Sequence, residues 1–283
     1  MVKLYIIGNG FDLKHKIPSR YSDFALYIAN HDITLYEQIE RCLKNLNTNG
    51  LWSNFEAALG TQDYDELQKD IIRNHDIKRD YPIGIDDNSL KMGFRDWVIA
   101  LKRYISNDDQ CFIPRMYALG KNDYYLSFNY TDTLEKVYNI DNSHICHIHG
   151  YIDSKDKDTE DSFVGYIYGH RNDEYKNEIE KLQIDDSYKY DLIGTIKGYQ
   201  KDIQGDDLRD FLAKVMRDGV SDIVVMGHSL NKIDSPYFKI IKEILINATW
   251  HIGYYDEADY VNKIKSCGDL EIDLENKHSL FKF

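Results

Sequence analysis

Four groups of small or polar residues in this sequence are of types that can bind a nucleotide or transfer a proton. Each group directly follows a short apolar stretch. In chain order they are Gly8-Asn9-Gly10, Asn129, His149-Gly150 and Gly227-His228-Ser229. Glycine lets backbone N–H groups approach a phosphate, a side-chain amide orients a hydroxyl or a water without titrating, and histidine exchanges a proton near neutral pH. Such residues could together bind a phosphate group, orient a hydroxyl or a water and exchange a proton.

The apolar stretches ahead of these groups predict the strands of a parallel sheet. Leu4-Tyr5-Ile6-Ile7 and Ile223-Val224-Val225-Met226 are short and rich in β-forming residues, as buried parallel strands are. Helical patterns separate the strands, for example the amphipathic segment 207–217. Strands that alternate with helices form a parallel sheet, and the carboxyl ends of its strands share one edge. We therefore expect the four groups to converge at that edge.

The rest of the chain completes an α/β fold with a largely parallel, Rossmann-type sheet. Further strands are predicted at 124–128, 145–148, 163–168, 250–254 and 270–274, helices at 21–30, 131–138 and 235–247, and a mixture of helix and loop at 171–204. From about 25 to 120 the apolar residues recur at helical spacing, and no strand pattern is convincing. We therefore predict a single domain, residues 1–283, with a helical insertion at about 25–120.

Composition and charge narrow the class of protein. The chain has 283 residues, 42% of them hydrophobic, which suits a soluble globular protein. Its net charge of -13 disfavours nucleic acid and anionic membranes as partners. We find neither a signal peptide nor a stretch approaching the ~18 apolar residues of a membrane span. The four cysteines are scattered without a C-x-x-C pair, which favours reduced thiols and a cytoplasmic location.

The glycine motif by itself is a weak signal. The dinucleotide-binding fingerprint has a third glycine three residues after the second, and Leu13 stands there instead. No Gly-Lys-Ser/Thr follows, so the stretch is not a P-loop. A tight strand-to-loop turn explains Gly8 and Gly10 equally well. Asp12, at the same edge, could hold a ribose hydroxyl or cap the segment that follows.

The histidines and the asparagine also have structural interpretations. Asn129 could cap the helix that follows it, and His149 could be a turn histidine bonded to backbone. His147 alternates with His149 on the predicted strand and, by period 2, points the same way, so the pair could form half of a metal site. No third ligand stands at a standard spacing, and we expect no metal.

Gly227-His228-Ser229 is similar to a nucleophile elbow that lacks its final glycine. A hydrolase triad would also require Asp256 and His278, and His278 lies in a polar tail. A phosphate or ribose contact, or a plain turn, is therefore the better interpretation of this stretch.

Five stretches resemble the abortive-infection protein H (AbiH) family of bacterial phage defence. They are LYIIGNGFDLKHKIPSRYSDF from Leu4, LWSNFE from Leu51, SFNYTDTLE from Ser127, HIHG from His147 and VMGHSLNKIDSPYF from Val225. The stretches span most of the chain in the expected order. The family in turn resembles the sirtuin-like NAD-consuming fold, with Gly-x-Gly after the first strand, an Asn after a middle strand, His-Gly after the next and Gly-x-Ser later.

The resemblance implies an anti-phage effector that hydrolyses NAD to nicotinamide and ADP-ribose, with NAD as substrate and no cofactor. It implies catalytic roles for Asn129 and His149, and nucleotide contacts for Gly8, Asn9, Gly10, Phe11, Asp12, Asp132, Gly227, His228 and Ser229. The family pattern often has Asp two residues after the Asn, whereas this chain has Thr131 there and Asp132 next. The absence of a sirtuin-type zinc ribbon argues against protein deacylation.

The resemblance also implies a phage-derived trigger, and we expect a homo-oligomer. Two further functions stay open. One is a non-enzymatic module that binds NAD or an ADP-ribose-type nucleotide and regulates a partner. The second is a nuclease-like effector that uses the histidine cluster. Turnover of NAD by pure protein separates the regulatory module from the hydrolase, and metal dependence identifies the nuclease.

Overall fold

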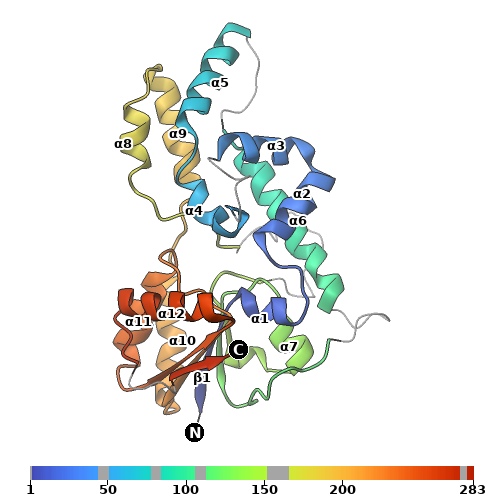
Figure 1. The fold of residues 1–283 in the computed structure, drawn as a ribbon, viewed down its shortest axis with the longest axis vertical. Helices are drawn as coiled ribbons and strands as arrows, with labels where there is room; N and C mark the ends of the chain where they lie inside the picture. The colour runs from blue at the N-terminus through green and yellow to red at the C-terminus, as the bar shows by residue number, and fades with distance from the viewer. Residues whose placement is uncertain (1, 44–50, 78–83, 106–112, 152–165, 275–278) are drawn as a thin grey trace. The chain divides into compact units, whose positions relative to one another are not determined.

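The computed structural model describes residues 2–43, 51–77, 84–105, 113–151, 166–274 and 279–283 (Figure 1). The chain divides into two compact units. One consists of residues 1–19, 101–167 and 203–283 and contains the sheet. The second consists of residues 20–100 and 168–202, and its described residues form helices joined by loops.

In the described residues the sheet has six strands, and every neighbouring pair is parallel. The strands are β1 (Lys3–Ile7), β2 (Tyr124–Ser127), β3 (Ile145–His147), β4 (Asp222–Met226), β5 (Thr249–Tyr254) and β6 (Leu280–Lys282). Their order is β3-β2-β1-β4-β5-β6, so the chain moves outward from β1 in one direction and then returns to its other side. The switch point lies between β1 and β4, and in such sheets ligands bind outside the carboxyl ends of the strands at that point.

Five helices among the described residues belong to the sheet-containing unit. They are α1 (Asn9–Lys14), α7 (Thr133–Tyr138), α10 (Gly205–Arg217), α11 (Ser235–Ile244) and α12 (Glu257–Asp269). The α10 sequence places Leu208, Leu212 and Val215 on one buried face, as its amphipathic pattern predicts. Pro236 stands at the start of α11, where its missing N–H leaves no hydrogen bond unmade.

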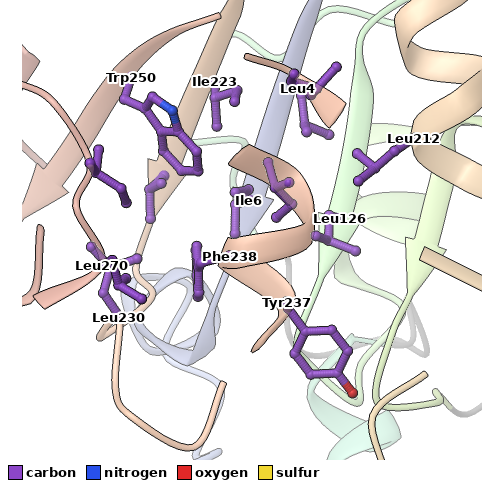
Figure 2. Packing of buried hydrophobic residues seen from close by; sticks show 14 of the residues in the cluster. Leu4, Ile6, Leu126, Leu212, Ile223, Leu230, Tyr237, Phe238, Trp250 and Leu270 are labelled. Carbon is purple, nitrogen blue, oxygen red and sulfur yellow. The ribbon is translucent and has the colours of Figure 1, made fainter. Parts of the chain in front are cut away.

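Alternation along the strands produces a hydrophobic core on each face of the sheet. On one face, Leu4 and Ile6 of β1 pack with β2, β4 and the helices α10, α11 and α12. Figure 2 shows Phe238 of α11 among these strand residues. On the opposite face, Tyr5 and Ile7 pack with Phe11 of α1 and with α7. Since both faces are covered, the central strands β1 and β4 are mostly apolar, as buried parallel strands are.

The helical unit contains α2 (Tyr21–His31), α3 (Ile33–Cys42), α4 (Phe55–Leu59), α5 (Tyr64–Ile77), most of α6 (Asp87–Ile105), α8 (Tyr175–Glu180) and α9 (Asp186–Gly198). An aromatic cluster forms part of its core: the rings of Phe55, Phe94 and Trp97 all lie within 6 Å of the Phe24 ring. In neither unit does the described part of the chain contain a helix long and apolar enough to cross a membrane.

The structure confirms the α/β class, the parallel sheet and the strands predicted at 4–7, 124–128, 145–148, 223–226 and 250–254. The described part of 25–120 contains helices and no strand, as expected. Most of the helical unit comes from this predicted insertion, but α8 and α9 join it from later in the chain. That residues 1–283 act as one domain stays a prediction.

One predicted strand is wrong, and a second is not formed in the part that the structure describes. At 163–168, residues 166–168 form no strand, and 163–165 lie outside the described residues. At 270–274, Leu270 caps the end of α12 and Glu271 has a φ of 53°. Leu270 and Ile272 are apolar because they pack into the core from this turn. The sixth strand lies instead at Leu280–Lys282, close to the end of the chain.

Candidate functional site

The loops that leave β1, β2, β3 and β4 bring the predicted polar groups to one edge of the sheet, within the sheet-containing unit. Asp12 comes from α1, and Asn129 with Thr131 and Thr133 from the β2–α7 segment. His149 follows β3 directly, and His228 follows β4. The convergence expected from the sequence is therefore present.

Glycine is required after β1 because two backbones meet there. A Cβ at Gly8 would lie 2.5 Å from the Cα of His228, and a Cβ at Gly10 would lie 2.8 Å from the Cα of Gly227. Gly227 itself has a φ of 70°, which favours glycine. The turn that leaves β1 is thus packed directly against the turn that leaves β4.

Backbone hydrogen bonds stabilise the turn after β1 and join it to the turn after β4. The N–H of Gly8 donates to the Met226 carbonyl at 3.0 Å, and the N–H of Gly10 donates to the Gly227 carbonyl at 2.8 Å. The Phe11 N–H donates to the Gly8 carbonyl at 2.9 Å. These three N–H groups already have acceptors, so packing explains Gly8 and Gly10, and a phosphate contact there stays a prediction.

The remaining predicted contacts after β1 differ in exposure. Asn9 is exposed, and its side-chain oxygen accepts a hydrogen bond from the Ser19 hydroxyl. Phe11 is fully buried, with its ring packed against Tyr117 and Tyr138, so only its backbone could face a ligand.

Asp12 is a buried carboxyl held by two threonines. Only 1% of the residue is exposed. Thr131 Oγ1 donates to one carboxylate oxygen at 2.6 Å, and Thr133 Oγ1 donates to the second at 2.9 Å. Burial raises the pKa of Asp12 to about 6, while the hydroxyls act in the opposite direction. Thr131, the departure from the family pattern, thus anchors the β2–α7 segment to α1.

Asn129 has an unusual environment for a buried amide. The residue is 5% exposed, and neither its side-chain oxygen nor its side-chain nitrogen has a hydrogen-bond partner among the described residues. The amide lies near enough to Asp12 to lower the pKa of that carboxyl, but without hydrogen-bond geometry. Buried polar groups nearly always have a partner, so an orphaned amide at the carboxyl edge of the sheet is a candidate position for a ligand or water contact.

Asn129 does not cap the following helix. The helix α7 begins at Thr133, and Asp132 is its N-cap residue. Asp132 makes no side-chain capping bond, and burial raises its pKa. The capping explanation for Asn129 is therefore wrong.

His149 is buried within an aromatic setting. Its ring centroid lies 5.0 Å from that of Phe128, 5.7 Å from Tyr237 and 6.2 Å from Tyr130. Phe128 and Tyr130 are the residues on either side of Asn129, which ties the two predicted catalytic residues to one region. The His149 carbonyl accepts a hydrogen bond from the Ile167 N–H at 2.9 Å.

The His147 side chain packs on the face of the sheet that α7 covers. Its Nε2 lies 2.7 Å from Glu135 Oε1 on α7, and its ring stacks on Tyr151. β3 ends at His147, and a turn follows in which the Gly150 N–H donates to the His147 carbonyl. The expectation that His147 and His149 point the same way is therefore wrong. No group of three His, Cys, Asp or Glu residues among the described ones is arranged to hold a metal.

Asp234 is a site residue that the sequence interpretation did not assign. Its Oδ1 lies 3.5 Å from His149 Nε2, and its Oδ2 lies 3.4 Å from His228 Nε2. All three residues are at most 4% exposed. The signal available was an acid in the KIDSPYF stretch, just before the serine and proline that begin α11.

Ser229, predicted to contact the nucleotide, is exposed. A hydrolase triad built on this serine would need His278, which lies outside the described residues. The residues on either side of Ser229, His228 and Leu230, are buried. Ser229 is therefore the exposed residue of these three in the turn after β4.

The chain matches a known protein family. The model of a family described as bacteriophage abortive infection AbiH matches residues 4–254. No curated protein and no solved structure matched the chain.

Proposed function

This chain belongs to the bacteriophage abortive infection AbiH family, and we propose that it acts in that defence by hydrolysing NAD to nicotinamide and ADP-ribose. The sheet supports a dinucleotide as ligand. Its order is that of doubly wound dinucleotide-binding sheets, which bind their ligand at the switch point between β1 and β4. The polar groups described above gather at this end of the strands. We assign the sheet to the sirtuin-like class as part of this proposal.

The orphaned amide of Asn129 is the observation that carries the proposal. An amide whose donor and acceptor are both buried without partners is unfavourable in the free protein by about 1–3 kcal/mol per group. A ribose hydroxyl or an attacking water can satisfy both atoms. An amide also does not titrate, so its donor and acceptor remain in place across the physiological pH range.

Hydrolysis of NAD requires a proton acceptor and protection from bulk solvent. Water forms a bond to the anomeric carbon of the ribose, the bond to the nicotinamide nitrogen breaks, and nicotinamide leaves uncharged. The proton released must go to a base, and neutral His149 can accept it from a ribose hydroxyl or the attacking water. The aromatic rings around His149 exclude solvent from its surroundings.

Nicotinamide release by purified protein tests the proposal. His149→Ala should lower turnover by about 10²–10⁴-fold while leaving NAD binding largely intact, because the proton transfer belongs to the transition state. Asn129→Ala should also remove most activity. The double variant should be hardly worse than either single one, since residues that act as a unit are not additive. Circular dichroism verifies folding.

His147→Ala is the matched control. His147 lies two residues from His149 but packs on the opposite face against Glu135, so its loss should affect stability rather than turnover. Full activity in a folded His149→Ala protein would move the chemistry elsewhere. Nucleotide binding without turnover, even with the phage trigger present, would favour the regulatory module. Metal-dependent cleavage of nucleic acid would favour the nuclease.

A further inference from the structure

The turn that follows β4 has an unfavourable backbone conformation. It contains two positive φ angles, 70° at Gly227 and 59° at Leu230. A bulky residue such as leucine rarely adopts a positive φ, and such conformations persist only where surrounding contacts hold them. They are concentrated at active sites and ligand-binding positions. The turn 227–230 lies at the switch point of the sheet, so the contacts that hold it bear directly on the candidate site.

Three consecutive carbonyls at this turn accept hydrogen bonds from other segments of the chain. The first two accept from backbone N–H groups of the turn after β1, as described above. The third, on His228, accepts from Nζ of Lys263 in α12. Within the turn, the Leu230 N–H donates to Nδ1 of His228 at 2.9 Å, and the Leu230 side chain is buried in the core (Figure 2). Lys263 thus supplies from α12 the hydrogen bond that fixes the third carbonyl.

Lys263 is a buried lysine, only 3% exposed. Its Nζ lies 3.5 Å from Oδ1 of Asp259, one helical turn earlier, and Oδ2 of Asp259 accepts the Tyr255 N–H at 2.8 Å. Burial lowers the pKa of Lys263, whereas Asp259 acts to raise it. Burial also raises the pKa of the Cys267 thiol, one turn later, to about 11, so that group is uncharged at neutral pH. A buried ammonium is unfavourable unless it is paired and hydrogen-bonded, and Lys263 is paired with Asp259 and bonded to the turn.

The bond to Lys263 also determines the direction of the next peptide N–H. The N–H and C=O of a planar trans peptide point in opposite directions. Because the His228 carbonyl points to Lys263, the N–H of Ser229 points away from it. Ser229 is exposed, and its N–H and hydroxyl are donors of the kind that bind a phosphate oxygen.

We propose that Lys263 is a positioning residue, which holds the turn 227–230 in this conformation so that Ser229 donates hydrogen bonds to a phosphate group of the bound nucleotide. The phosphate contact rests on the proposed function, whereas the holding of the turn by Lys263 does not. A turn that is held before binding loses less conformational entropy when the ligand binds. Loss of Lys263 should therefore weaken binding more than it slows the chemical step.

Amide hydrogen exchange followed by NMR measures the turn without any ligand or activity. Lys263→Met keeps the side-chain length and removes the ammonium. The Leu230 amide should then exchange about 10–100-fold faster than in wild type, because a hydrogen bond from a charged group is lost. The amide of Ile6, in the central strand β1, reports global unfolding and should change by a smaller factor. Lys263→Arg keeps a cationic donor and should keep Leu230 protected.

Calorimetric titration with ADP-ribose is the second measurement. Lys263→Met should raise the Kd of ADP-ribose by about 5–30-fold, which corresponds to the loss of one or two well-placed hydrogen bonds. The KM for NAD should rise with it, and kcat should change less, because the phosphate contact is made in the ground state as well as in the transition state.

Lys242→Met is the matched control. Lys242 also donates from Nζ to a backbone carbonyl, that of Leu270 at 2.7 Å, and it also lies near a carboxylate, that of Glu271 at 3.6 Å. This contact is at the C-terminal end of α12, whereas α12 begins two residues after β5, beside the carboxyl edge. Its loss should leave both Leu230 exchange and ADP-ribose binding unchanged.

The results separate this inference from the proposed function. Leu230 exchange at the wild-type rate in folded Lys263→Met would overturn the role of Lys263, and so would an equal effect of Lys242→Met. Faster exchange with unchanged ADP-ribose binding would overturn the phosphate contact. Absence of ADP-ribose binding by wild-type protein would remove the phosphate contact together with the proposed function, and the exchange rates would still decide whether Lys263 holds the turn. Lys263→Gln replaces the methionine variant in these measurements if that variant does not fold.

Discussion

Individual buried polar side chains distinguish the site from the core around it. Asp12 is satisfied by two threonine hydroxyls, whereas Asn129, in the same region, has no partner among the described residues. A satisfied polar group adds to stability, and an orphaned one detracts from it. Mutations of these two residues should therefore change the free energy of unfolding by different amounts.

Asn129→Ala should leave stability nearly unchanged. The variant loses some packing but removes two unpaired polar atoms, so its free energy of unfolding should stay within about 1 kcal/mol of wild type. Thr131→Val is the comparison, because it removes a hydroxyl that donates to Asp12 and should cost about 1–3 kcal/mol. Urea denaturation measures both. A large loss in Asn129→Ala would show that the amide has a structural partner.

Asp12 should make stability depend on pH. Its pKa of about 6 in the folded protein lies above the unfolded value of 3.8, so the folded state binds more protons between these values. The free energy of unfolding therefore decreases as pH rises from about 4 to 6, and the decrease is complete above that range. The effect is on the order of 2–3 kcal/mol.

Asp12→Asn should remove that dependence. The stability of the variant relative to wild type should rise between about pH 4 and 6, as measured by urea denaturation at several pH values. The exposed Asp210→Asn is the control and should follow wild type. Parallel pH curves for wild type and Asp12→Asn would contradict the raised pKa.

At the scale of elements, the turn after β1 and the turn after β4 form one packed unit. A Gly10→Val variant would therefore not test phosphate binding on its own. The added side chain would meet Gly227 before it could meet a phosphate, so weakened ADP-ribose binding in that variant would not identify a phosphate site. Stability is the more informative measurement for these glycines.

Gly227→Ala should destabilise the protein by several kcal/mol. Its φ of 70° disfavours non-glycine residues, and the new Cβ would collide with the backbone at Phe11 and Gly10. Gly268→Ala is the matched control, since that glycine lies in α12 with open space around its Cβ position. It should gain about 0.5–1 kcal/mol. Thermal unfolding of the two variants should therefore shift in opposite directions.

At the scale of the whole molecule, every residue in the candidate site comes from the sheet-containing unit. That unit is assembled from three separate stretches of chain, so its sheet forms only after residues far apart in sequence meet. A ligand that binds this assembled edge must stabilise the folded chain, because the unfolded chain has no such edge.

ADP-ribose should raise the unfolding temperature of the whole protein. A ligand at about 100 times its dissociation constant adds about 2.7 kcal/mol of stability. We expect a smaller shift in Asn129→Ala and an undiminished shift in Gly268→Ala, measured by scanning calorimetry. No shift at any ADP-ribose concentration would remove nucleotide binding from the proposed function, whatever the fate of the catalytic residues.

Sequence patterns were sufficient to predict most of the strands, their parallel arrangement and the edge where the polar groups meet. These follow from local information: apolar runs such as 4–7 mark strands buried on both faces, and the residue after each strand must lie at the carboxyl edge. The sequence alone therefore predicts that Asn129 and His149 lie at that edge.

Which side chains meet there depends on tertiary packing. Asp234 faces His149 because the helix α11 packs on the sheet and brings the preceding loop to that edge. No local sequence pattern predicts this contact. His147 and His149 separate because β3 ends between them. Contacts of this kind depend on how helices and strands pack together, whereas hydrophobic periodicity and turn residues predict only local structure.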